Sequence, residues 1–269
     1  MPTAATGCYA APFIYTRHLL ADGLIGQVHE IDYLLHAALP ALIPYSWVHR
    51  LQDGGGNLNN LFTHQLQQVL LMTAGQVRAA TGEARILHAK APIGRAIHDF
   101  RDVFEAMLTP EEAAAAEWRE TDADQAYTVV VQLQLADGAV ANVLFRNSGV
   151  DMPPQPSSVT FFGTEGMLRL SGPFWPDGTI EHFAPTRGAW TELVLPQAVV
   201  DTLPPVDDAA QRQWNQFYRE FVADVRGEGY AGYPTFRDGW VAVEVTDIAR
   251  SGRSWTPLPK YPPGPGQQT

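Results

Sequence analysis

The strongest constraint on the fold is a run of alternating residues near the middle of the chain. From Tyr127 to Leu135 every odd position is apolar, which is the period-two pattern of a β-strand with one buried face. Asp137-Gly138 comes next, a dipeptide typical of a two-residue type I′ turn, and an apolar run over 140–145 follows it. The sequence therefore predicts an antiparallel β-hairpin in this region.

Other segments extend this hairpin into a large sheet with helices. The predicted strands cover 7–12, 27–37, 76–90, 157–162, 166–171, 178–184 and 190–195, and the predicted helices cover 13–22, 57–73, 208–226 and 237–250, with helical pieces near 99–107 and after Pro110. The expected fold class is α+β: a large, mostly antiparallel open sheet with helices packed on one face. No linker divides the chain, so we expect a single domain over 1–258 and a disordered, Pro/Gly-rich tail over 259–269.

Composition excludes several classes of protein. The chain carries 29 acidic and 18 basic residues, a net charge of −11, so an extended nucleic-acid-binding surface is not expected. A single cysteine, Cys8, excludes an internal disulfide framework and fits a reducing compartment. The longest apolar stretch, residues 33–47, is interrupted by His36, Pro40 and Pro44, so it does not suit a membrane span. We expect a soluble, cytoplasmic protein with no membrane partner.

The most informative segment opens the predicted helix over 57–73, directly after Gly54-Gly55-Gly56. On an α-helix the polar positions Asn57, Asn60, His64 and Gln67 share one face, and Leu58, Phe62, Leu66 and Val69 form a core stripe opposite. A solvated helix face normally carries Lys, Glu or Arg, yet no charged residue occurs from 57 to 73. Neutral amides around one histidine suit either a buried polar network or a pocket for a hydroxylated ligand, and the residues leave both interpretations open.

Other motifs give no site. The glycines over 227–232 match G-x-G-x-x-G, but they follow a predicted helix, whereas a dinucleotide loop follows a strand and opens a helix. Asp122 and Asp124 are interpreted as part of a strand-entry loop. The histidines show no metal-binding spacing, and no G-x-S-x-G or H-E-x-x-H occurs. We therefore predict no metal site and no cofactor site within this chain.

Five short motifs, in order along nearly the whole chain, resemble one known family, the Gfo/Idh/MocA oxidoreductases, in their C-terminal α/β domain. They are the segments over 19–26 (L-L-A-D-G-L-I-G), 54–67 (G-G-G-N-L-N-N-L-F-T-H-Q-L-Q), 137–139 (D-G-A), 162–168 (F-G-T-E-G-M-L) and 236–239 (F-R-D-G). The resemblance implies the same fold as the α+β prediction. In the family a Rossmann domain with an E-K-P motif precedes this domain and binds NAD(P), and this sequence contains neither feature.

The resemblance also points to a site. The two aspartates of the family's helix motif fall on Asn60 and Gln67, and its histidine falls on His64. An amide cannot accept a proton as a general base, so His64 is the candidate catalytic residue if any chemistry survives. The residues expected to bind substrate are Asn57, Asn60, His64, Gln67 and Trp47.

These observations predict a substrate-binding and oligomerisation domain like that of the NAD(P)-dependent sugar or polyol oxidoreductases. We expect it to be truncated or completed by a separate Rossmann partner, to take NAD(P) only with that partner, and not to be redox-active alone. The alternative is a stand-alone, non-redox binding or interaction module for a hydroxylated small molecule. The even positions of the strand over 127–135 mix Val130 with Thr128, Gln132 and Gln134, so we expect a homodimer or tetramer through this open sheet face.

Overall fold

The structure is a computed structural model that describes residues 6–99, 102–103, 105–150, 156–172, 178–229 and 233–259. The predicted tail therefore lies outside the described residues from position 260 onward. Within the described residues, no helix is long and apolar enough to cross a membrane.

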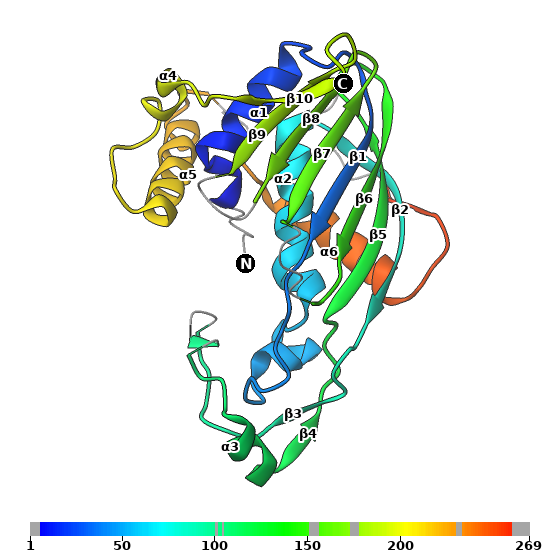
Figure 1. The fold of residues 1–269 in the computed structure, drawn as a ribbon, viewed down its shortest axis with the longest axis vertical. Helices are drawn as coiled ribbons and strands as arrows, with labels where there is room; N and C mark the ends of the chain where they lie inside the picture. The colour runs from blue at the N-terminus through cyan, green and yellow to red at the C-terminus, as the bar shows by residue number, and fades with distance from the viewer. Residues whose placement is uncertain are drawn as a thin grey trace.

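A twisted nine-stranded sheet forms the centre of the molecule (Figure 1). Its order is β10-β9-β8-β7-β1-β6-β5-β2-β11, and among these strands only β1 and β6 pair in parallel. The strands are β1 (Val28–Leu35), β2 (Gln76–Arg85), β5 (Ala126–Gln134), β6 (Val140–Asn147), β7 (Ser158–Gly163), β8 (Met167–Ser171), β9 (Thr179–Ala184), β10 (Ala189–Leu193) and β11 (Thr256–Pro257). The predicted hairpin is β5–β6, with Gly138 in the left-handed region at φ +87°. The predicted α+β fold class is confirmed.

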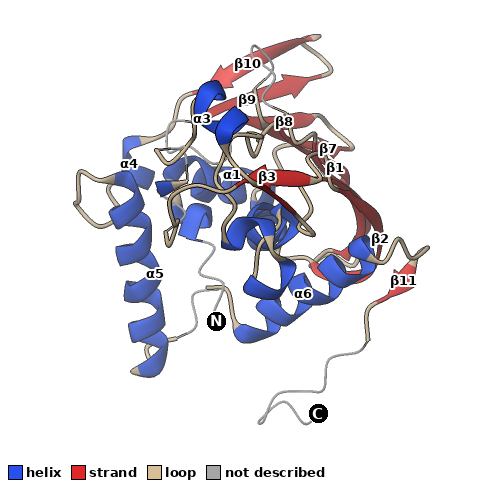
Figure 2. Ribbon diagram, turned by 90° about the horizontal axis from the view of Figure 1, so that it is seen from below, coloured by secondary structure: helices blue, strands red, loops and turns tan. Residues whose placement is uncertain are grey.

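Three helices cover one face of the sheet, as Figure 2 shows from below. They are α1 (Ala11–Ala21), α2 (Thr63–Thr73), which continues a π-helical turn over Leu58–Phe62, and α6 (Phe236–Arg250). Helix α2 packs against both α1 and α6. It is therefore enclosed on three sides, which explains why its sequence carries no charge.

The main hydrophobic core lies between these helices and the sheet. The predicted stripe of Leu58, Phe62, Leu66 and Val69 is fully buried, as are all odd positions of β5. Two buried tyrosines tie α2 to the sheet: Tyr33 donates to Gln68 Oε1 at 2.5 Å, and Tyr127 donates to Gln65 Oε1. A buried polar group is costly unless it is paired, so these two bonds fix how α2 sits on the strands.

One predicted helix does not cover the sheet. Helix α5 (Ala209–Val225) packs mainly against the short 3₁₀ turn η1 (Thr6–Tyr9), where Tyr9 contacts Phe217 edge-on and donates to Glu220 at 2.9 Å. In Figure 1 it stands beside the body of the molecule with the short helix α4 (Gln197–Val200). The expectation that it covers the sheet was wrong, because an amphipathic pattern shows that a face is apolar but not what that face meets.

Three further differences separate prediction from structure. The segment 7–12, predicted as a strand, forms η1 and the start of α1, where Pro12 suits a first helical turn because its fixed φ is already helical. The strand predicted over 76–90 ends at Arg85. Of the helical piece predicted near 99–107, residues 100, 101 and 104 lie outside the described part, and the rest forms no α-helix.

A small lobe extends from one end of the sheet, at the lower end of Figure 1. It contains the small two-stranded antiparallel sheet of β3 (Lys90–Pro92) and β4 (Trp118–Glu120), the helix α3 (Pro110–Ala115) and the loop after β1. Its own apolar cluster consists of Leu39, Ile43, Val48, Ile97, Val103 and Ala106, with Trp47 packed against it. The lobe is thus held by a second, smaller core.

His49 in this lobe makes stability depend on pH. Its side chain is buried, its Nδ1 accepts a hydrogen bond from the Ser46 N–H at 3.2 Å, and burial, with a smaller effect of nearby His88, lowers its pKa from 6.5 to about 4. Because the folded state binds the proton less readily than the unfolded state, stability is complete above the unfolded pKa and falls as pH drops from 6.5 toward 4.

We expect the free energy of unfolding of the wild type to fall by up to ~3 kcal/mol relative to His49→Gln across that window. Urea unfolding at several pH values checks this, with His29→Gln, an exposed histidine on β1, as the control. Parallel pH profiles for the wild type and His49→Gln would contradict it.

Candidate functional site

A glycine loop positions the helix that carries the predicted site. A Cβ at Gly55 would lie 2.5 Å from the Trp47 carbonyl oxygen, and Gly56 has φ +95° with the Asp124 carboxylate 2.7 Å from where its Cβ would be. A side chain at either position would collide, and at Gly56 it would also strain the backbone. The glycines therefore let this loop pack tightly between the lobe and the start of β5.

Asp124 holds the start of the helix in place. Its carboxylate accepts from the Leu58 N–H at 2.6 Å and from the Arg250 Nε–H at 2.9 Å, and Arg250 Nη2 lies 2.9 Å from the same oxygen as an ion-pair contact. Its carbonyl accepts from the Asn57 N–H at 2.8 Å. The side chain is 5% exposed. A carboxylate is favourable at a helix start because it pairs the unsatisfied N–H groups there. Asp124 thus joins the first turn of the helix that begins at Leu58 to the last turn of α6. It lies in the predicted strand-entry loop, but it also has this structural role.

The wide π-helical turn separates the four predicted polar residues. The Thr63 N–H bonds to the Leu58 carbonyl five residues back, so the turn holds more residues than an α-helical turn. Asn57 donates to the Gln125 carbonyl at 2.6 Å, and Asn60 donates to the carbonyls of Gly54 and Gly56 at 3.1 and 2.8 Å. Both amides hold the glycine loop, which fits the structural network considered for this face.

His64 and Gln67 lie farther along the helix in a different environment. His64 is half-buried, forms no hydrogen bond with the described residues, and has its pKa lowered by burial. Gln67 is 1% exposed, and its Nε2 has no partner among the described residues. A neutral imidazole offers one donor and one acceptor. These two residues therefore keep unused hydrogen-bonding groups, unlike the two asparagines.

Trp47 lies in the lobe, apart from the other four predicted residues. It belongs to a short 3₁₀ turn, η2 (Trp47–His49), and lines a lobe pocket with Tyr45, Arg50, His98 and Arg119. Next to it in the chain, the Val48 carbonyl accepts from the Gly56 N–H at 3.2 Å, which attaches this turn to the glycine loop. The structure thus divides the predicted set between a helix face and a lobe.

Sequence reasoning missed the two residues that fix this region from a distance. Arg250 ends α6, and Gln125 precedes β5, where its Oε1 accepts from the backbone N–H groups of Leu87 and His88 at 2.8 and 2.6 Å. One feature of the sequence could have pointed to Gln125. The polar pair Asp124-Gln125 directly precedes the predicted strand whose buried face is apolar.

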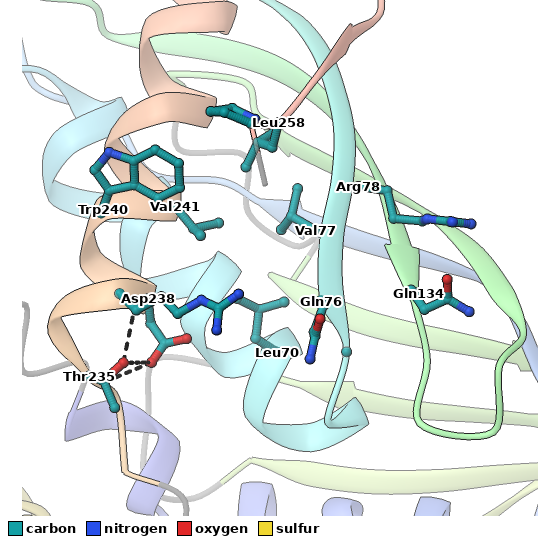
Figure 3. A pocket seen from close by; sticks show the side chains of 13 residues that line it. Leu70, Gln76, Val77, Arg78, Gln134, Thr235, Asp238, Trp240, Val241 and Leu258 are labelled. Atoms are coloured by element: carbon teal, nitrogen blue, oxygen red, sulfur yellow. Dashed lines mark hydrogen bonds between the residues drawn. The ribbon is translucent and has the colours of Figure 1, made fainter. Parts of the chain in front are cut away.

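Four pockets in the described part of the chain have no lining residue among Asn57, Asn60, His64 and Gln67. The largest of these four, ≈ 840 Å³, lies between α6 and β2, where Val241 and Val77 point toward one another (Figure 3). At its lower end Thr235 and Asp238 bond to each other and cap α6. His64 therefore lies outside all four of these pockets.

The described residues do not fit a nicotinamide dinucleotide. A Rossmann site needs parallel strands with a glycine turn between a strand and a helix, whereas Gly227 directly follows α5 and the sheet contains one parallel pair. Nor does any group of three or more His, Cys, Asp and Glu side chains in the described part come together to hold a metal. No hydride-transfer step is therefore derived from this chain alone.

Comparison with known families decides what this arrangement is. The family model described as the GFO/IDH/MocA C-terminal domain matches residues 13–169, more than half of the chain. The chain belongs to the Gfo/Idh/MocA family. No curated protein matches the sequence. The resemblance inferred from the five motifs is thereby confirmed.

Solved structures share this Gfo/Idh/MocA fold at low identity. An NAD-binding oxidoreductase from Klebsiella pneumoniae is 18% identical with a TM-score of 0.72, and the match covers 96% of this chain and 66% of that one. Levoglucosan dehydrogenase in complex with NADH and L-sorbose is 16% identical with a TM-score of 0.71, and the match covers 95% of this chain and 66% of that one. A super-repressor mutant of Gal80p from Saccharomyces cerevisiae is 12% identical with a TM-score of 0.66, and the match covers 95% of this chain and 65% of that one. The chain thus spans about two thirds of these structures.

The structure explains one Gfo/Idh/MocA motif physically. A Cβ at Gly163, in the Gly163-Thr164-Glu165-Gly166 turn, would collide with the Ile25 carbonyl oxygen. The Glu165 N–H donates to that same carbonyl at 2.9 Å, and the Thr164 N–H donates to the Gln27 carbonyl at 3.0 Å. The turn therefore packs over the segment that joins α1 to β1. That segment contains the end of the family motif over 19–26.

We expect Asp124→Ala to lower the free energy of unfolding by about 3–5 kcal/mol, because it leaves the Arg250 charge and the Leu58 N–H without their partner. Urea unfolding measures this. The matched control is Asp122→Ala in the same loop, whose carboxylate accepts one exposed bond from the Leu51 N–H and whose loss costs ~1 kcal/mol or less. Equal losses for the two variants would show that Asp124 does not hold the helix start.

Proposed function

We propose that this domain is the substrate-binding and oligomerisation half of a sugar or polyol oxidoreductase, with NAD(P) supplied by a Rossmann unit. The observation that carries the proposal is His64. Its imidazole is half-buried, unpaired among the described residues and located at the histidine of the family motif. Gln67, one helical turn away, adds a buried Nε2 without a partner. Such groups are typical of a site that a second unit and a ligand complete.

The chemistry proposed for His64 is hydrogen bonding to a substrate hydroxyl. Burial lowers its pKa, so the imidazole is neutral at neutral pH and both donates and accepts. Asn60 and Gln67 stand where the family has aspartates, and neither can raise its basicity as a carboxylate would. His64 would therefore orient a substrate hydroxyl, and NAD(P) held by the Rossmann unit would supply the hydride-transfer chemistry.

We expect His64→Ala to leave the melting temperature nearly unchanged, because no described residue loses a hydrogen bond, and to abolish any shift caused by ligand. Thermal unfolding with levoglucosan, L-sorbose or sorbitol, with and without NADH, measures both effects. His29→Ala is the control for loss of an exposed histidine.

If His64 instead has a structural role, His64→Ala costs ~1–3 kcal/mol of stability and no polyol shifts the wild type. That combination would overturn the proposal.

The second candidate is a stand-alone, non-redox binding module. It is favoured by the likeness to the super-repressor mutant of Gal80p, which shares this fold. Two results together would favour this candidate. The wild type would bind a polyol with the same affinity whether or not a nicotinamide nucleotide is present, and it would not turn over NAD(P).

The oligomeric part of the proposal concerns the face of the sheet opposite the helices. The strand register places Phe162, Met167, Phe183 and Trp190 in one row across β7 to β10, all of them half-buried in the isolated chain. Beside them Arg169 pairs with Glu181 and lies 4.3 Å from the Trp190 ring centroid. An apolar centre with a paired polar rim is the composition of a protein–protein interface.

We expect a homodimer or tetramer by light scattering at about 50 μM, and a shift to monomer in Met167→Glu, because the new charge would be buried in the interface. Thr191→Glu is the matched control, since it adds the same charge to β10 at an exposed position on the other side of the sheet. A wild type that is already monomeric would contradict the proposed interface.

A further inference from the structure

The lobe carries a pocket that the proposed function does not use. It has a volume of ≈ 340 Å³, and none of its lining residues comes from α2. Two arginines, one tyrosine and one tryptophan converge on it: Arg50, Arg119, Tyr45 and Trp47. Pockets that combine aromatic rings with a few placed charged groups are the usual form of small-molecule sites.

Backbone hydrogen bonds fix these side chains from separate parts of the chain. The Tyr45 N–H donates to the Pro92 carbonyl at 2.7 Å, which attaches the loop to β3. Arg119 lies on β4 opposite Ala91. The Arg50 N–H donates to the Trp47 carbonyl at 3.0 Å. The pocket is therefore built where the loop after β1 packs against the two-stranded β3–β4 sheet.

The Tyr45 ring is the centre of the cluster. The guanidinium carbons of Arg50 and Arg119 lie 5.8 and 5.7 Å from its centroid, within the range of a cation–π contact. The same ring stacks on His49 at 5.9 Å with an interplanar angle of 14°. Both guanidinium groups and the His49 ring thus contact the one Tyr45 ring.

The two arginines differ in how their charge is satisfied. Arg50 pairs with Asp53, whereas no carboxylate lies within ion-pair distance of Arg119 among the described residues. Arg119 is exposed and is one of the residues that line the pocket. The residues that line the pocket include these two arginines and no carboxylate, although the chain has a net charge of −11. A guanidinium held in this way suits a carboxylate or phosphate, which it can bind with two parallel hydrogen bonds.

We propose that this lobe pocket binds a small carbohydrate derivative that carries a carboxylate or a phosphate. Arg119, with Arg50 beside it, binds the anionic group. The faces of Tyr45 and Trp47 contact the carbon skeleton of the ligand. The site is separate from His64, so it stands whether or not the proposed function is correct.

Isothermal titration calorimetry of the full chain tests this with four probes: glucose 6-phosphate, glucuronate, glucose and inorganic phosphate. We expect one or both charged sugars to bind with a dissociation constant of ~1 mM or tighter, and glucose and inorganic phosphate to bind at least tenfold more weakly. The difference between glucose 6-phosphate and glucuronate identifies the preferred anionic group. In Arg119→Gln the affinity for the charged sugar falls at least tenfold.

Arg187→Gln is the matched control, since it removes the same charge from an exposed turn between β9 and β10 and should leave binding unchanged. The proposal is overturned if neither charged sugar binds, if Arg119→Gln binds as the wild type does, if both arginine variants weaken binding equally, or if inorganic phosphate binds as tightly as glucose 6-phosphate. His64→Ala is titrated in parallel. Its effect bears on the proposed function and not on the lobe, so the two failures are distinguishable.

Discussion

The Asp124 carboxylate is the interaction on which the arrangement of the domain depends. It lies at the junction of the glycine loop, the first turn of the helix that continues into α2, and the end of α6, and it bonds to the last two of these through Leu58 and Arg250. It also fills the space beside Gly56 that any side chain would occupy. Because one buried group sets both helix ends against the sheet, the position of His64 follows from a contact outside its own helix.

The sequence predicted the fold well where the signal is local, and poorly where it depends on distant partners. The alternation over 127–135 and the Asp137-Gly138 turn predicted β5–β6, since side-chain period and turn conformation are properties of neighbouring residues. Helix α5 was found but placed wrongly, because its apolar stripe is the same whether it meets a sheet or η1. The role of Arg250 could not be predicted, since its partner lies 126 residues away.

The candidate site shows the same division. The sequence identified the uncharged helix and its histidine, but it placed Asn57, Asn60, His64 and Gln67 on one face by assuming a regular α-helical period. The π-helical turn changes that period, so the asparagines meet the glycine loop while His64 does not. A local helix irregularity of this kind has no reliable sequence pattern, and it decides which polar residues remain available to a ligand.

The distribution of satisfied and unsatisfied groups on α2 then bears on what the domain does. The side-chain oxygens of Gln65 and Gln68 accept from buried tyrosines, and Asn60 pairs with the loop, so these amides serve the fold, although the Gln65 Nε2 also has no partner among the described residues. A helix that only had to be buried would use apolar residues at 64 and 67 as well, because an unpaired buried polar group lowers stability. The structure instead retains a half-buried imidazole and a buried amide without partners among the described residues. That cost to stability is understandable if a ligand and a second unit supply the missing hydrogen bonds.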